Sequence, residues 1–147
     1  MIINAMPVTT PIGILLVDDD DGDVKAVQRA FTKVKIANPI ERAIDGVDAL
    51  EILRGTNGRS KINAPYLLLV DLNMPRMNGV ELVREMRADP ILHQTLIFML
   101  TTSKRDEDKL AAYSLNIAGY ILKEKAGEDF LNLVALVGTY WRIVEIP

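Results

Sequence analysis

The sequence predicts an α/β fold in which a doubly wound, five-stranded parallel sheet lies between two layers of helices. Short apolar runs alternate with helical patterns from end to end of the 147-residue chain, which is typical of a parallel sheet with right-handed crossovers. The strongest strand candidates are apolar on both faces, as strands covered by helices on both sides are. Polar side chains follow most of these runs, at the edge of the sheet where parallel sheets form their sites.

Five short runs are the expected strands. The first, third and fourth are continuous and apolar, whereas the second is weaker because charged residues interrupt it. The expected strands are, in order, 12–17, 39–44, 67–70, 96–100 and 118–122.

Helical patterns fill the segments between these strands. In the first helix, apolar residues recur at steps of three and four, which indicates one buried face: Val24, Val27, Ala30, Phe31 and Val34. Asp21 or Asp23 is expected to cap its start, and Asp45 to cap the second helix. The remaining helices are expected at 79–88, at 105–115 and from 127 onward, and residues 54–65, rich in Gly, Asn and Ser, form a loop.

Length and composition favour a single domain over residues 12–140, with an N-terminal arm at 1–11 and no output domain. The C-terminal tail, 141–147, is expected to pack on the domain or lie at a dimer interface. The chain has no cysteine and shows neither a secretory signal nor an apolar stretch of the ~20 residues that span a membrane. The net charge of −3 argues against a nucleic-acid partner. We therefore expect a cytoplasmic protein without nucleic-acid or membrane partners.

Reactive side chains follow four of the expected strands: Asp18 and Asp19, Asp71, Thr101, and Lys123. The first and third strands of a doubly wound sheet are expected neighbours, so their carboxylates meet at the switch point. Clustered carboxylates suit Mg²⁺, and a carboxylate is also a nucleophile for phosphoryl groups. A lysine ammonium would help to neutralise the transferring group.

These residues and their spacing resemble the response regulator receiver domain across essentially the whole chain. The matching segments are 14–19 (ILLVDD), 70–75 (VDLNMP) with Gly79, Leu100–Thr101, and Gly119–Tyr120 with Lys123. The resemblance implies the flavodoxin-like, five-unit (βα) receiver fold in three layers.

The resemblance also implies a role for each matched residue. Asp71 would accept a phosphoryl group, and Mg²⁺ (with Mn²⁺ as a substitute) would bind Asp18, Asp19, Asp71 and the backbone carbonyl of Asn73. Lys123 would contact the phosphoryl group, Thr101 and Tyr120 would be the switch residues, and Asn73 and Ser103 would tune dephosphorylation. Such a protein is a phosphoacceptor regulator rather than an enzyme with a separate substrate, although it takes part in its own phosphorylation and dephosphorylation.

A finer resemblance is to single-domain regulators of phytochrome-type histidine kinases. It rests on the long loop before the third strand, the run Leu100–Ser103, the absence of proline after Lys123, and the tail that begins at Tyr140. It implies a sensor histidine kinase, such as a bacteriophytochrome, as partner, and a homodimer.

Other interpretations of the same residues remain open. The receiver fold could serve as a phosphorylation-independent interaction module, or Asp71 could belong to a Mg²⁺-dependent phosphatase. The phosphatase chemistry requires a second acid two residues on, where this chain has Asn73. Asp20, Asp21 and Asp23 are expected to face solvent or cap a helix without a chemical role. His93, the only histidine, is expected on the surface. One histidine without a Cys or Ser partner pattern argues against nucleophilic hydrolase chemistry.

Overall fold

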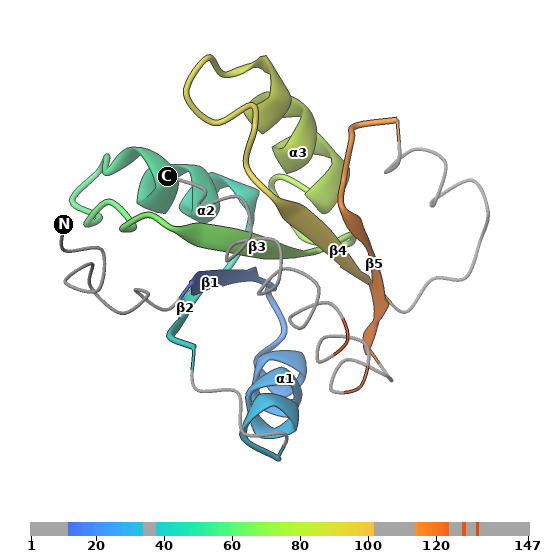
Figure 1. Ribbon diagram of the computed structural model, residues 1–147. Helices are drawn as coiled ribbons and strands as arrows, with labels where there is room; N and C mark the ends of the chain where they lie inside the picture. The colour runs from blue at the N-terminus through green and yellow to red at the C-terminus, as the bar shows by residue number, and fades with distance from the viewer. Residues whose placement is uncertain (1–11, 34–37, 102–113, 124–127, 129–131, 133–147) are drawn as a thin grey trace, which may run out of the picture.

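The computed structural model describes residues 12–33, 38–101, 114–123, 128 and 132. Their centre is a five-stranded, all-parallel sheet with the order β2-β1-β3-β4-β5 (Figure 1). The strands are β1 (Gly13–Val17), β2 (Ile40–Ala43), β3 (Tyr66–Asp71), β4 (Ile97–Thr101) and β5 (Gly119–Leu122). The predicted doubly wound parallel sheet is confirmed, and each strand begins and ends within one residue of its expected bounds.

Helices cover both faces of the sheet. α2 (Gly46–Arg54) and α3 (Gly79–Ala88) lie on one face, and α1 (Asp21–Lys33) lies on the other (Figure 1). Two separate apolar clusters fill the layers, and the predicted face of α1 contributes Val24, Val27 and Phe31 to one of them. α2 begins as expected, because the Asp45 side chain accepts a hydrogen bond from the backbone N–H of Asp48.

The strand register brings the expected site residues to one edge of the sheet. Val17 lies opposite Val70, Asp71 opposite Leu100, and Thr101 opposite Leu122. In this register Asp18, which follows Val17, is level with Asp71, and Lys123 lies two residues beyond Ile121, the residue of β5 that is level with Asp71. This alignment follows from the parallel pairing, which places all carboxyl ends together.

Two local predictions were wrong. The predicted cap of α1 at Asp21 or Asp23 is wrong, whereas the capping role that the sequence also allowed for Asp20 is confirmed: the Asp20 side chain accepts a hydrogen bond from the Asp23 N–H at 2.9 Å. The helix expected at 105–115 does not continue to its predicted end, because residues 114–116 form a turn in which Asn116 has a φ of 58°. Asparagine tolerates this left-handed conformation better than most residues.

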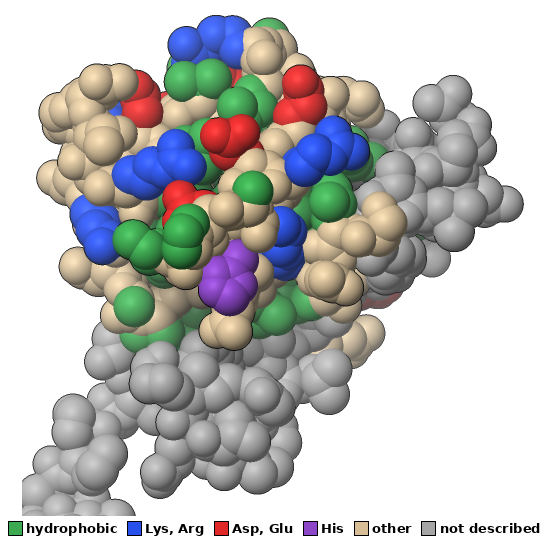
Figure 2. All heavy atoms as spheres, turned by 90° about the horizontal axis from the view of Figure 1, so that it is seen from above, with side chains coloured by type: hydrophobic (Ala, Val, Ile, Leu, Met, Phe, Trp, Pro, Cys, Tyr) green, Lys and Arg blue, Asp and Glu red, His purple; other side chains and the backbone are tan. Residues whose placement is uncertain are grey.

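Several expectations lie outside the described residues. They are the arm at 1–11, the tail at 141–147, Ser103, and most of the two C-terminal helices. In the last of these helices, Glu128 and Asn132 are described as helical. Among the helices that are described, none is long and apolar enough to cross a membrane. Figure 2 shows the face over α2 and α3, where acidic and basic side chains are interspersed. His93 is exposed, as expected.

Candidate functional site

Asp71 is the last residue of β3 and is almost completely buried. Its Oδ1 accepts a long hydrogen bond from the Asn73 N–H at 3.5 Å. The chain turns away from the sheet directly after Asp71, where the Leu72 N–H still donates to the Leu100 carbonyl at 3.3 Å. The end of an apolar strand therefore holds a single carboxylate at the edge of the core.

Asp18 and Asp19 follow β1, the neighbour of β3 in the sheet. Asp18 is completely buried, and Asp19 is exposed. Asp18 Oδ1 accepts a hydrogen bond from the Asp20 N–H at 2.9 Å, whereas its buried Oδ2 has no hydrogen bond. A buried carboxylate oxygen that lacks a hydrogen bond is unfavourable unless a cation lies close to it.

Lys123 follows β5 and brings an ammonium group to these carboxylates. Its Nζ lies 3.3 Å from Asp18 Oδ2 and 3.3 Å from Asp71 Oδ1. A third contact, to Asp23 Oδ2 on the first turn of α1, is shorter at 2.6 Å. The Lys123 ammonium thus joins the end of β5 to the start of α1 and to the ends of β1 and β3.

The electrostatics of the site follow from burial and crowding. Burial raises the pKa of Asp71 to about 6; Lys123 opposes this effect, and the charge of Asp18 adds to it. Burial also raises the pKa of Asp18, against the hydrogen bond from Asp20 and the charge of Lys123. For Lys123, burial alone would lower the pKa, but the hydrogen bond to Asp23 and the charges of Asp71 and Asp18 raise it above its ordinary value. The site therefore favours additional positive charge.

The same residues fit a divalent cation. One carboxylate oxygen from each of Asp18, Asp19 and Asp71 lies within 4.8 Å of the others. Hard oxygen ligands of this kind suit small divalent cations, which complete their shell with water or phosphate oxygens. The buried Asp18 Oδ2 has no hydrogen bond and, among the described residues, only the Lys123 ammonium, 3.3 Å away, beside it, so a divalent cation would stabilise it further.

The structure says less about three other residues that the sequence predicted for the site. Thr101 is the last residue of β4, and its side chain is outside the described part of the structure. Tyr120 lies in β5, is partly buried, and packs against the apolar cluster under α2 and α3. Asn73 is exposed in the loop after β3, two residues from Asp71. Their roles stay predictions.

The loop after β3 is held by contacts that the sequence analysis missed. Arg76 Nε and Nη2 donate to the two oxygens of Asp45, at 2.6 and 3.0 Å, and so attach this loop to the start of α2. Burial raises the pKa of Asp45, but the hydrogen bonds from Arg76 and Asp48 outweigh it and lower the pKa overall. At the other end of the loop, a Cβ at Gly79 would overlap the backbone carbonyl oxygen of Asp71. Glycine therefore lets α3 begin directly beside the acidic site.

The contact between Asp23 and Lys123 was also not predicted from the sequence. The sequence predicted only a solvent-facing or capping role for Asp23, whereas the structure pairs it with Lys123, 100 residues away. Asp21 lies on the same first turn of α1 and pairs with Arg42 instead, so no local pattern in the sequence singles out Asp23 for this contact.

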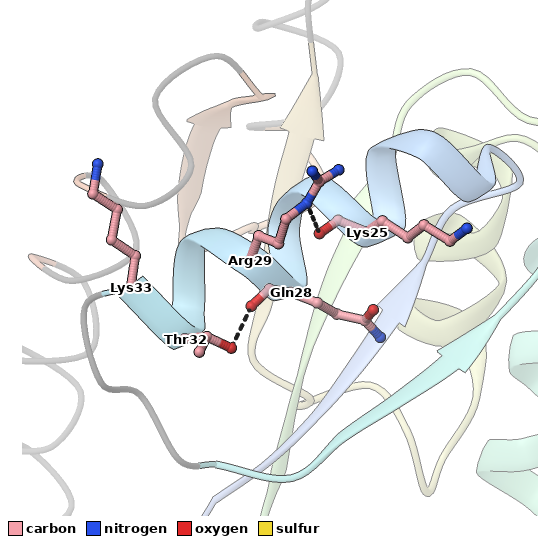
Figure 3. Close-up of a pocket in the computed structure, with 5 residues that line it drawn as sticks. All are labelled: Lys25, Gln28, Arg29, Thr32 and Lys33. Atoms are coloured by element: carbon pink, nitrogen blue, oxygen red, sulfur yellow. Dashed lines mark hydrogen bonds between the residues drawn. The ribbon is translucent and has the colours of Figure 1, made fainter.

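A hollow on the outer face of α1 is chemically different from the site at the strand ends. It is lined by Lys25, Gln28, Arg29, Thr32 and Lys33, of which three are cationic (Figure 3). Thr32 and Arg29 use their side chains to donate to backbone carbonyls one turn earlier in the helix. Such a lining cannot hold a divalent cation, so the carboxylate cluster remains the candidate site.

Comparisons with known proteins agree with this geometry. Residues 14–135 match the family model described as "Response regulator receiver domain". The chain is 30% identical to response regulator Rcp1 of Synechocystis sp. over 131 residues, which cover 89% of each protein.

Solved structures are similar in fold. A two-component response regulator from Legionella pneumophila is 37% identical, with a TM-score of 0.78 over 87% of this chain and 98% of that one. The bacteriophytochrome response regulator AtBRR is 27% identical, with a TM-score of 0.78 over 90% and 96%. The Mn²⁺-bound form of Rcp1 is 28% identical, with a TM-score of 0.68 over 91% and 96%.

The family match covers most of the chain, and the carboxylate cluster lies at the strand ends that it includes. The chain belongs to the response regulator receiver domain family, whose members are regulatory proteins of two-component systems that accept a phosphoryl group on an aspartate.

Proposed function

We propose that Asp71 is the phosphoacceptor of this receiver domain. The observation that carries the proposal is the position of this carboxylate: it is buried at the end of β3, 3.3 Å from Lys123 Nζ, and grouped with Asp18 and Asp19. Phosphoryl transfer requires positioning and neutralisation of charge more than any other catalytic device, and these residues supply both.

Asp18, Asp19 and Asp71, with the backbone carbonyl of Asn73, are the proposed ligands of Mg²⁺, for which Mn²⁺ can substitute. When bound, the cation would supply the positive charge that offsets the clustered carboxylates and the phosphoryl oxygens. The Mn²⁺-bound form of the relative Rcp1 and the buried Asp18 Oδ2 without a hydrogen bond support this assignment.

The proposed donor is the phosphohistidine of a sensor histidine kinase. An Asp71 carboxylate oxygen forms the new P–O bond as the P–N bond of the phosphohistidine breaks, and the electron pair returns to the imidazole nitrogen. Lys123 stabilises the phosphoryl oxygens, whereas Asn73 and Ser103 modulate the later attack of water on the phosphoryl group.

The output is a change in association. The proposed switch residues are Thr101, which would bond the phosphoryl group, and Tyr120, which would turn inward behind it. The half-buried position of Tyr120 in β5 supports this role, because a side chain at the edge of the core can adopt a second, more buried arrangement.

Intact mass spectrometry tests the acceptor. Wild type, incubated with Mg²⁺ and phosphoramidate, is expected to gain one phosphoryl group, and Asp71→Asn is expected to gain none. A chelator should abolish the gain because the clustered carboxylates then remain uncompensated. Labelling of Asp71→Asn, or no labelling of wild type where a control receiver is labelled, would contradict the proposal. The latter result would favour a phosphorylation-independent interaction module.

The proposed kinase is of the phytochrome type, since Rcp1 and AtBRR, the latter named as a bacteriophytochrome response regulator, are similar across most of this chain. A phosphorylated kinase of this type, substituted for phosphoramidate in the same measurement, should label wild type and not Asp71→Asn. Slower transfer than from an unrelated histidine kinase would argue against this pairing.

We also infer a homodimer whose interface includes the apolar C-terminal tail, 141–147. Burying this tail against a second copy would remove apolar surface from water. The solution mass of the full chain, measured by light scattering, should be that of a dimer, and a chain that ends at Tyr140 should be monomeric. An unchanged oligomeric state after truncation would exclude the tail from the interface.

A further inference from the structure

The shortest contact of the Lys123 ammonium is to a carboxylate outside the proposed metal and phosphoryl site. Its distance to Asp23 Oδ2 is 2.6 Å, compared with 3.3 Å to each of Asp18 and Asp71. Lys123 itself is largely buried, with 14% of its side chain exposed. The ammonium is therefore bound more closely to α1 than to the proposed phosphoacceptor.

Local structure holds Asp23 in this position. Asp20 caps α1 by accepting a hydrogen bond from the Asp23 N–H, and the next residue, Val24, is buried in the core. With its backbone held on both sides, Asp23 projects from the first turn of the helix, where a carboxylate also interacts favourably with the helix dipole. The contact is thus built into the start of α1 and is not a chance pairing of two surface chains.

A phosphoryl group on Asp71 would bring further acceptor oxygens to Lys123, in addition to the carboxylates that it already contacts. The ammonium has three hydrogens, and three carboxylates are already within 3.3 Å or less. Asp18 is fully buried, but 40% of the Asp23 side chain is exposed, so water can solvate Asp23 once its contact is lost. Asp23 is therefore the partner that Lys123 can leave at the smallest cost.

We propose that Asp23 is a positioning residue that holds Lys123 in the unphosphorylated protein and competes with the phosphoryl group for it. This inference rests on the proposed function of Asp71 and Lys123. Asp23 keeps the ammonium close to the acceptor before transfer, and the loss of this contact makes the phosphorylated state less favourable than it would otherwise be. The residue thereby sets the balance between the two states.

Asp21 provides a matched control. It lies in the same turn of α1 and carries the same charge, but it is exposed and pairs with Arg42 Nη1 at 2.7 Å instead of with Lys123. Asp21→Asn removes one negative charge near the site, as Asp23→Asn does, and leaves the Lys123 contacts in place. A difference in ligand affinity between these two variants therefore comes from the loss of the Asp23–Lys123 contact, and not from the loss of one negative charge near the site.

The test measures the affinity of beryllofluoride, a noncovalent mimic of the phosphoryl group, by calorimetry at saturating Mg²⁺. Asp23→Asn is expected to bind it roughly fivefold more tightly than Asp21→Asn does, the size of effect expected for a half-exposed charged contact. Asp23→Glu, which retains the carboxylate, should return the affinity toward that of wild type. In a Lys123→Met background, Asp23→Asn should have no effect, because the residue that it acts through is gone. Should Asp23→Asn fail to fold by circular dichroism, Asp23→Ser replaces it.

The outcomes separate the two proposals. Equal affinities of Asp23→Asn and Asp21→Asn, in a protein that phosphoramidate labels on Asp71, would overturn the role of Asp23 and leave the proposed function intact. An undiminished effect of Asp23→Asn in the Lys123→Met background would also overturn it. If wild type is not labelled and does not bind beryllofluoride, both proposals are wrong.

Discussion

Asp71→Asn is expected to stabilise the metal-free protein at pH 8 by about 3 kcal/mol, because a shift of about two pKa units corresponds to that free energy. Burial is the main cause, since it raises the pKa of Asp71 to about 6 from its ordinary value of 3.8. At pH 8 the native state must hold this carboxylate ionised beside Asp18, whereas the unfolded chain exposes it to water. Asparagine has nearly the same shape and carries no charge.

The stabilisation depends on pH in a defined direction. Between pH 3.8 and about 6 the native protein binds more protons at Asp71 than the unfolded chain does, so stability falls as pH rises through this window. Above about pH 6, Asp71 is ionised in the native state and lowers the free energy of unfolding by its full amount. The advantage of asparagine should therefore shrink to roughly 1 kcal/mol at pH 4.5.

Urea denaturation with a chelator, at pH 4.5 and pH 8, measures this effect. Asp21→Asn is the control, because its carboxylate is exposed and lies outside the carboxylate cluster. Addition of Mg²⁺ at pH 8 should stabilise wild type more than Asp71→Asn, since the cation provides the missing positive charge. A variant that is less stable than wild type at pH 8 would show that the Lys123 contact outweighs burial.

Arg87→Met is expected to lower the free energy of unfolding by about 3 kcal/mol and the melting temperature by roughly 10 °C. Arg87, near the end of α3, donates to four backbone carbonyls that belong to two separate loops. The acceptors, at 2.8 to 3.0 Å, are those of Leu115, His93, Thr95 and Asn116. Methionine retains much of the apolar length of the side chain but leaves these carbonyls without their donor.

Calorimetric melts of wild type and the variant measure the loss. Arg84→Met is the matched control: it removes the same charge from an exposed position of the same helix and should leave the melting temperature almost unchanged. If both variants have the same melting temperature, water replaces the Arg87 hydrogen bonds without a loss of stability. Arg87 would then not hold the turn before β5.

Much of the candidate site could be predicted because it depends on properties of single segments. Asp18 and Asp71 come directly after short apolar runs, whose length and alternation with helical patterns favour buried strands that end at the edge of the sheet. The buried face of α1 follows in the same way from the spacing of Val24, Val27 and Phe31. Parallel order then brings the two carboxylates together without further information.

The pairings between distant segments depended on the tertiary structure. Asp23 meets Lys123, Asp45 meets Arg76, and Arg87 meets two loops only because the sheet order and the helix positions bring them within a few ångströms. A charged residue on a helix has the same local pattern whether it faces water or a partner, so the sequence could not distinguish Asp23 from Asp21. The sequence by itself determined the layers, the strand ends and the residue types at the site. Only the tertiary structure decided which charges pair, because a pairing is a distance between segments and local periodicity contains no such distance.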